Sequence, residues 1–202
     1  MKPFRARRLL HALCICYALV WILAAINPVK RDDWLIENIL VFIAVPALIL
    51  SYRRVPLSDA AYVLIVLFLV LHAAGAHYSY SEVPFGYWLK ETFDLQRNHF
   101  DRIVHLSFGL LLTYPMHEIL TRTVKIRASW ALLLSPVMII SLSGFFEIVE
   151  AIVAWLVSPE LGQAYLGTQG DVWDAQKDMA LAIFGSGVVA TIVALRDRRQ
   201  YS

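Results

Sequence analysis

Acids and histidines recur at helical spacing in three short segments of the sequence. Asp101 and His105 are four residues apart, and Glu147 and Glu150 are three apart. A third set follows in steps of three and four residues: Asp171, Asp174 and Asp178. Residues at these spacings lie on one face of an α-helix, so each segment can present its polar groups together. We predict that the three segments share one chemical site.

Carboxylates and imidazoles together are typical ligands of divalent metals. Oxygen ligands alone favour magnesium or calcium, and an added histidine admits zinc, manganese or iron. We predict a divalent metal, of undetermined identity, with six candidate ligands: Glu147, Glu150, Asp171, Asp174, Asp178 and His77. A bound metal would offset the repulsion among the acids and could activate water for attack on a phosphate or ester. Without a metal, the same acids suit general acid catalysis or a proton relay.

The predicted catalytic residues are His105, Asp101, Glu147 and Glu150. His105 would serve as a ligand or general base, with Asp101 as its orienting partner. Lys177 and Arg102 are predicted to contact a substrate phosphate. A structural interpretation stands beside each assignment: Asp101 can cap a helix next to a hydrogen-bonded core histidine. Asp171 and Asp174 can likewise cap the helix that follows them.

The composition places these residues in a membrane protein. Hydrophobic residues make up 59% of the 202 residues and charged residues 17%, and the mean hydropathy is +0.60. Soluble domains are usually less apolar and carry about 25% charged residues. The formal charge of +2 is too small to indicate a nucleic-acid partner. The expected partner is the lipid bilayer, with a lipid or lipid-linked molecule as a candidate substrate; the oligomeric state is left open.

Six apolar stretches are long enough to cross a hydrocarbon core of roughly 30 Å. The fold class predicted is an all-α polytopic transmembrane bundle, forming a single integral membrane domain over residues 1–202. The first stretch follows four cations and exceeds the usual length of a signal-peptide core, which favours a retained helix. The predicted helices cover residues 9–26, 34–51, 57–74, 103–120, 130–156 and 178–195.

The distribution of Lys and Arg predicts the orientation. Twelve cations fall on the side of both termini and six on the other side, so the positive-inside rule places both termini in the cytoplasm. The long loops 75–102 and 157–177 then face outward. With this topology, the fourth and sixth helices descend from the outer face and the fifth climbs towards it. The three acidic segments and His77 are therefore expected at one level of the membrane.

Several segments resemble the YjdF family of bacterial inner-membrane proteins. These are residues 97–109, which run from Arg-Asn-His-Phe-Asp to Ser-Phe-Gly, and residues 146–150, Phe-Glu-Ile-Val-Glu. Residues 166–179 contain the motif Gly-Thr-Gln-Gly-Asp-Val-Trp-Asp, and residues 75–78 fit as well. The resemblance covers nearly the whole chain and implies an inner-membrane location without implying an activity.

A more distant similarity exists to VanZ-like membrane proteins. The shared features are the Asp-x-x-x-His start of a helix at Asp101, an acidic position within a helix, and an Asp-bearing start of the last helix. The resemblance implies a role in the cell envelope or in glycopeptide tolerance. The chain departs from that pattern at residues 168–169, Thr-Gln, where an arginine is usual.

Three hypotheses follow for the function. The first is an enzyme that acts on an envelope lipid or a lipid-linked phosphate from the outer leaflet. The second is an ion- or proton-coupled transporter or binding protein that uses the same acids. The third is a structural membrane protein whose polar cluster fixes helix packing. The inner halves of the predicted helices carry few acids, which favours a site open to one side only.

Overall fold

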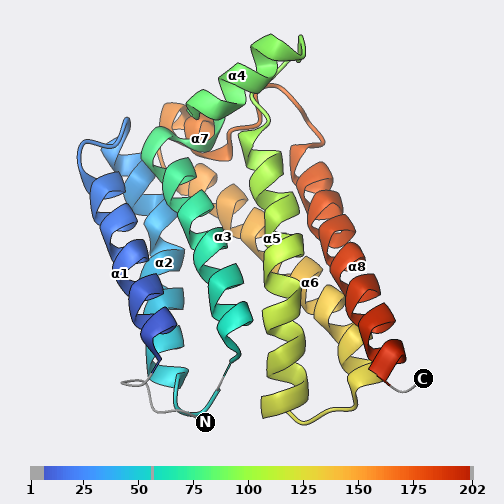
Figure 1. The fold of residues 1–202 in the computed structure, drawn as a ribbon. Helices are drawn as coiled ribbons and strands as arrows, with labels where there is room; N and C mark the ends of the chain where they lie inside the picture. Colours follow the sequence, from blue (N-terminus) through green and yellow to red (C-terminus); the bar gives the residue numbers. More distant parts are fainter. Residues whose placement is uncertain (1–6, 56, 201–202) are drawn as a thin grey trace.

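A computed structural model describes residues 7–55 and 57–200, without the side chains of residues 164 and 197–200. Lys2 and Arg5, two of the cations counted for the orientation, lie outside the described residues. Most of the described residues are helical, and no strand occurs among them. Six long helices form a bundle (Figure 1), and each is long and apolar enough to cross a membrane. The predicted all-α class with six candidate spans is confirmed.

The long helices start and end close to the predicted limits, with three differences that matter for the site. The third continues to Tyr78, and the fourth and sixth begin at Phe100 and Asp174. Asp101 and Asp174 therefore lie within helices. The bounds are α1 Arg8–Ala25, α2 Arg31–Ser51, α3 Asp59–Tyr78, α5 Phe100–Glu118, α6 Ala128–Leu156 and α8 Asp174–Gln200. A π-helical turn, η3 (Ile119–Thr123), extends α5.

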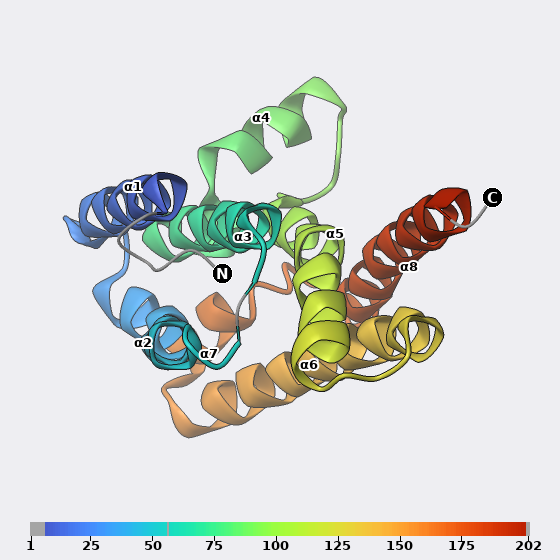
Figure 2. The ribbon, with the colours of Figure 1, turned by 60° about the horizontal axis from the view of Figure 1, so that its bottom comes forward.

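Two short helices occupy the segments expected as long loops. They are α4 (Pro84–Thr92) and α7 (Pro159–Leu166), and each begins with proline, which fits the first turn of a helix. Both lie at one end of the bundle, opposite the end where the described chain starts and finishes (Figure 1). We call these ends the capped end and the terminal end. On α4 the stacked rings of Phe85 and Trp88 are exposed, and α4 projects beside α3, away from the other helices (Figure 2).

Helix α6 is longer than a bilayer core requires. Its 29 residues correspond to about 43 Å at about 1.5 Å per residue, against a core of roughly 30 Å. The helix accommodates this length by crossing the bundle obliquely behind α3 and α5 (Figures 1 and 2). Its second half, which carries Glu147 and Glu150, thereby reaches the capped end.

Small residues let α5 and α8 approach closely. A Cβ on Gly109 would lie 2.1 Å from the carbonyl oxygen of Ala182, and one on Gly185 would lie 2.6 Å from that of Leu106. Thr113 Oγ1 donates to Ser186 Oγ at 2.7 Å across the same contact. Small residues of this kind drive helix association in membranes, where no hydrophobic difference separates lipid from protein. The close α5–α8 contact brings the N-terminal turns of both helices together.

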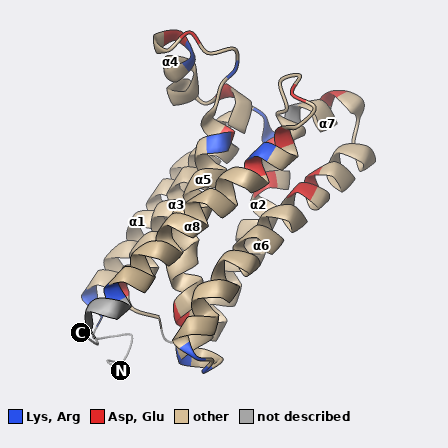
Figure 3. Cartoon of the chain, turned by 90° about the vertical axis from the view of Figure 1, so that its right-hand side faces the viewer, with Lys and Arg blue, Asp and Glu red and all other residues tan. Residues whose placement is uncertain are grey.

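Charged residues gather at the two ends of the bundle and leave its middle apolar (Figure 3). Large apolar side chains instead cover the outside, as at Ile43 and Leu50, which are 63% and 81% exposed. Cys14 and Cys16 are free and exposed among them. An apolar exterior is stable in lipid, so the polar groups buried inside the capped end are the ones that need an explanation.

Candidate functional site

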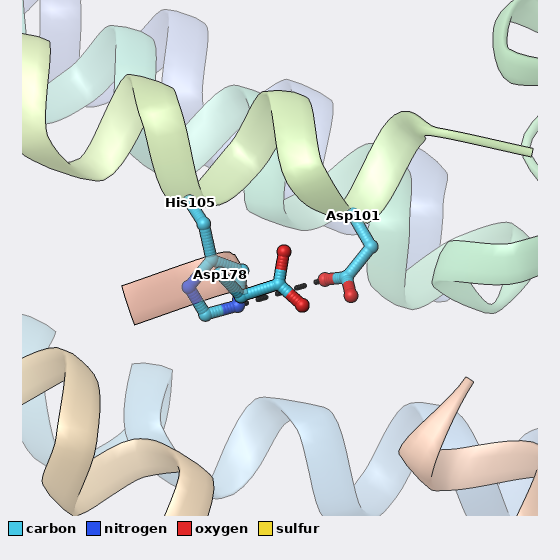
Figure 4. Close-up of side chains that lie close together, drawn as sticks. All are labelled: Asp101, His105 and Asp178. Atoms are coloured by element: carbon cyan, nitrogen blue, oxygen red, sulfur yellow. Dashed lines mark ion pairs between the residues drawn. The ribbon is translucent and has the colours of Figure 1, made fainter. Parts of the chain in front are cut away.

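Asp101, His105 and Asp178 form a compact group inside the capped end (Figure 4). Asp101 and His105 are one turn apart on α5, and Asp178 comes from the facing turn of α8. One potential ligand atom from each residue lies within 4.8 Å of the other two. His105 Nε2 is 3.7 Å from Asp101 Oδ1, and His105 and Asp178 are only 8% and 2% exposed. The helical spacing and the close α5–α8 contact together create this group.

Glu147 completes the group from α6. Its Oε1 atom lies 3.5 Å from His105 Nε2, and its side chain is 11% exposed. Neither Glu147 Oε1 nor Asp178 Oδ1 has a hydrogen-bond partner among the described residues. A buried polar atom left in this state costs about 1–3 kcal/mol. Asp101, His105, Glu147 and Asp178, which we call the donor set, therefore offer oxygen atoms that a proton or a cation would satisfy.

Two separations within the donor set are close to those between neighbouring ligands of a metal ion. Two ligand atoms at about 2.1 Å from a tetrahedral metal are roughly 3.4 Å apart. The two separations measured at His105 Nε2, 3.5 and 3.7 Å, need only a small contraction to reach that value. One imidazole with carboxylates matches the ligand preferences of zinc, manganese or iron.

Asp171 and Asp174 belong to a separate ion-pair network. The guanidinium of Arg97, which is 8% exposed, donates to both carboxylate oxygens of Asp174, one of them at 3.1 Å. Arg102 donates to Asp171 at 2.5 Å and to Asp174 at 3.2 Å. Lys177 Nζ donates to Asp171 at 2.6 Å. The two aspartates are thus already neutralised, and the predicted phosphate contacts Arg102 and Lys177 are engaged with them.

The network shifts the pKa values of two groups outside the membrane-spanning helices, Asp171 and His99. Hydrogen bonds from Lys177, from the backbone N–H of Trp173 and from Arg102 hold the pKa of Asp171 well below its usual range. Burial and the neighbouring arginines lower the pKa of His99, so its imidazole is neutral at pH 7. Asp171 therefore stays ionised across the physiological range.

Hydrogen bonds join residues 97–100 to the loop before α8. The side-chain amide of Gln169 accepts from the backbone N–H of Asn98 at 3.0 Å and donates to its carbonyl at 2.9 Å. Arg97 donates to the carbonyls of Gly167 and Thr168. The Gly-Thr-Gln-Gly motif thus fixes where α5 and α8 begin, and with them the positions of Asp101 and Asp178.

Two acids on α2 join the buried layer although sequence reasoning did not single them out. Asp33 and Glu37 are 1% and 3% exposed. Ser79 Oγ donates to Asp33 Oδ2, whereas Asp33 Oδ1 and Glu37 Oε2 have no hydrogen-bond partner among the described residues. Their spacing of four residues in an apolar helix was an available signal. A predicted span that begins at residue 34 leaves Asp33 outside the membrane and separates it from Glu37, so the prediction does not show the pair.

Two phenols lie within electrostatic reach of these acids. Burial and the carboxylates of Glu37, Asp101 and Glu150 raise the pKa of Tyr80 well above its usual value. Burial, with Glu37 and Glu150 among the nearby acids, does the same for the pKa of Tyr165. Both phenols therefore remain protonated and can act as hydrogen-bond donors. The hydroxyl of Tyr80 forms a hydrogen bond of 2.5 Å with Nδ1 of His72, a buried residue of α3.

The remaining predicted site residues have different surroundings. Glu150 is half-buried, and its carboxyl group lies within hydrogen-bonding reach of Glu147. His77 lies apart from the donor set: its Nδ1 is 2.9 Å from the carbonyl oxygen of Ala24 on α1, to which it can donate. The structure thus brings together Asp101, His105, Glu147, Glu150 and Asp178 and gives His77 a contact with another helix.

Comparisons with known proteins agree with this architecture. The family model described as "Predicted membrane protein (DUF2238)" matches residues 9–199. The inner membrane protein YjdF of Escherichia coli (strain K12) is 31% identical over 199 residues, which cover 96% of this chain and 90% of that protein. No solved structure matches the chain. The resemblance to the YjdF family is confirmed, while the more distant one to VanZ-like proteins stays a prediction. The chain belongs to the DUF2238 family of predicted membrane proteins.

Proposed function

We propose that the protein is a multi-pass inner-membrane enzyme that binds a divalent metal at its capped end. Its substrate would be the phosphate or ester group of an envelope lipid in the outer leaflet. The observation that carries the proposal is the donor set, in which His105 Nε2 faces carboxylates from three helices. The location draws on the relative from Escherichia coli, which is named an inner membrane protein.

Charge supports an outward-facing capped end. Of the cations at the terminal end, Arg53, Arg54, Lys125 and Arg127 are exposed. At the capped end Arg97 and Arg102 are buried or half-buried, whereas Arg31 and Lys177 are exposed. The positive-inside rule counts Lys and Arg whether or not they are paired, and the sequence carries twelve of them on the side of the termini and six on the other side. This excess supports a donor set near the outer surface of the membrane.

The residues around the donor set suggest a division of roles. A metal held by Asp101, His105, Glu147 and Asp178 would lower the pKa of a bound water and polarise a phosphate or ester oxygen. Glu150, close to Glu147, is placed to accept a proton from such a water. Lys177 is 50% exposed beside Asp171 and can exchange that carboxylate for a substrate phosphate. Arg102 would contribute a second contact in the same way.

Metal content is the first measurement. The purified protein should carry close to one equivalent of zinc, manganese or iron by inductively coupled plasma mass spectrometry. His105→Ala and Glu147→Gln should lose it, because each removes a donor from the set. His77→Ala is the matched control: it removes a histidine at the same end whose Nδ1 faces Ala24.

Thermal unfolding in detergent should verify that every variant is folded. Wild-type protein free of metal after separate incubation with zinc, manganese and iron would refute the metal site, and so would loss of metal from His77→Ala alone. Loaded protein should then be tested for release of phosphate or fatty acid from phosphorylated lipids. Metal binding without turnover of any lipid would refute the proposed enzymatic activity, while the proposed metal site would still stand.

Glu37 favours a second candidate function, proton-coupled transport. Its carboxyl is 3% exposed on α2 and within electrostatic reach of Asp101 and Glu150. A carboxyl in such surroundings can carry a proton between the acids. In reconstituted vesicles, proton or ion flux that Glu37→Gln abolishes would support transport over catalysis. A proton and ion flux no greater than that of protein-free vesicles would exclude transport.

A further inference from the structure

A hollow of about 470 Å³ opens at the terminal end between α3, α5 and α8, far along the helices from the donor set. Its wall is aliphatic, with Leu64 from α3, Leu110 from α5 and Val193 from α8 among the lining residues. Arg122 and Arg196 lie at its polar side. A volume in this range suits a small ligand or part of a lipid chain.

The polar side of the hollow carries a net positive charge. Arg122, whose side chain is 51% exposed, pairs with Glu118 at 3.2 Å. Glu118 is buried and accepts the backbone N–H of Ser58 at 2.8 Å, so its carboxylate is held in place. Arg196 is exposed and forms no ion pair with any side chain that the structure describes. Two guanidinium groups and one carboxylate therefore line this side of the hollow, which leaves capacity for an anion.

The position along the helices favours a lipid over a free anion. Arg122 follows the C-terminal end of α5, and Arg196 lies near the end of the described part of α8. Arginines at the ends of membrane helices reach the headgroup region. The aliphatic wall extends from them towards the middle of the bundle. A free phosphate would gain no binding energy from this wall, whereas an acyl chain would be buried against it.

We propose that this hollow binds one anionic phospholipid from the surrounding leaflet. Arg122 and Arg196 would bind the headgroup phosphate, and the wall of α3, α5 and α8 would hold one acyl chain. The proposal is independent of the donor set, because it rests on a different end of the bundle and on different residues.

Native mass spectrometry of the full chain in detergent tests the proposal, with phosphatidylglycerol and phosphatidylethanolamine titrated separately. Wild-type protein should retain one phosphatidylglycerol molecule in preference to phosphatidylethanolamine. The double variant Arg122→Gln with Arg196→Gln should lose the preference, at about fivefold in affinity for each arginine, which corresponds to about 1 kcal/mol per charge. Arg53→Gln with Arg54→Gln, exposed cations of the same end, should keep it.

Two further variants separate binding from folding. Arg196→Gln alone leaves the Arg122–Glu118 pair intact and should still weaken phosphatidylglycerol binding about fivefold. Val193→Trp should fill the hollow and displace the bound lipid while the headgroup arginines remain. Equal retention of both lipids by wild-type protein, or equal losses in the Arg53/Arg54 control, would overturn the proposal.

Discussion

Asp174 and Asp178 are one turn apart on α8, yet their surroundings differ. Asp174 accepts hydrogen bonds from Arg97 and Arg102. Asp178 faces Asp101 and His105, and its Oδ1 has no hydrogen-bond partner among the described residues. A carboxylate paired with guanidinium groups is satisfied, whereas a buried carboxylate oxygen without a partner favours binding of a proton or a cation. Of these two neighbours, Asp178 is the one available to a ligand.

Asp171 should make the stability of the protein depend on pH in the acidic range. Its pKa is held low in the folded state by Lys177, Trp173 and Arg102. A carboxylate with a lowered folded-state pKa stabilises the fold fully above its unfolded pKa, about 3.9. This contribution is lost as the pH falls from there through the lowered folded value. Thermal unfolding of Asp171→Asn in detergent should therefore depend less on pH below about 5 than that of wild-type protein.

A partial variant checks the cause of this pH dependence. Lys177→Ala removes the hydrogen bond that lowers the pKa of Asp171 most but leaves Arg102 in place. Its pH dependence should lie between those of wild-type protein and Asp171→Asn. Identical acid sensitivity of all three proteins would mean that Asp171 does not contribute through its ionisation.

The sequence predicts the donor set better than it predicts its surroundings. Spacings of three and four residues within one helix fix which side chains share a face, so Asp101 and His105 could be paired from the sequence. The Arg97–Asp174 pair joins residues 77 positions apart, and no local pattern encodes it. Asp171 and Asp174 were therefore predicted as metal ligands, although arginines already occupy their carboxylates.

At the scale of helices, the α5–α8 contact should be sensitive to single methyl groups. Gly109→Ala and Gly185→Ala each place a Cβ within 2.6 Å of a backbone carbonyl of the facing helix. Overpacking of this kind typically costs about 1–3 kcal/mol. Both variants should unfold at lower temperature in detergent, and the metal content of Gly109→Ala should fall with the separation of α5 from α8.

Gly187 provides a matched control on the same helix. A Cβ at Gly187 meets nothing within 4 Å, and alanine is favoured over glycine within a helix by up to about 1 kcal/mol. Gly187→Ala should therefore leave the unfolding temperature unchanged or raise it. A loss of stability at Gly187 equal to that at Gly109 would show that the added methyl group destabilises α8 irrespective of the close contact with α5.

Hydropathy predicts the six long helices because length and apolar content alone qualify a span. The same criterion cannot find α4 and α7, which have nine and eight residues and carry polar side chains. The only local indications were Pro84 and Pro159 at their first turns. Where these helices lie at the capped end depends on tertiary contacts, such as that of Asn98 with the carbonyl of Val83 just before α4.

For the whole molecule, the orientation in the membrane is a prediction that labelling can test. In a background with Cys14→Ala and Cys16→Ala, single cysteines should replace exposed residues at the two ends: Glu91 on α4 and Arg53 at the terminal end. If the capped end faces outward as predicted, a membrane-impermeant maleimide should label the cysteine at 91 in intact cells. It should label the cysteine at 53 only after the membrane is permeabilised.

The reverse labelling pattern would place both termini outside, and the enzyme proposal would then have to move to the cytoplasmic leaflet. Labelling of both positions in intact cells would indicate either a leaky preparation or two orientations. A cysteine at residue 43, within the apolar exterior of α2, should stay unlabelled in either case, because lipid covers this position.

The exposed rings of α4 have a consequence for how deep the protein sits in the membrane. Phe85 and Trp88 stack on each other outside the bundle, on a helix that projects beside α3. Aromatic rings of this kind settle at the boundary between headgroups and acyl chains. Because only residues 93–99 join α4 to the start of α5, we expect rings anchored at this boundary to keep Asp101 and His105 near the lipid surface. The aromatic pair would thus be an interfacial anchor for the end of the bundle that holds the buried acids.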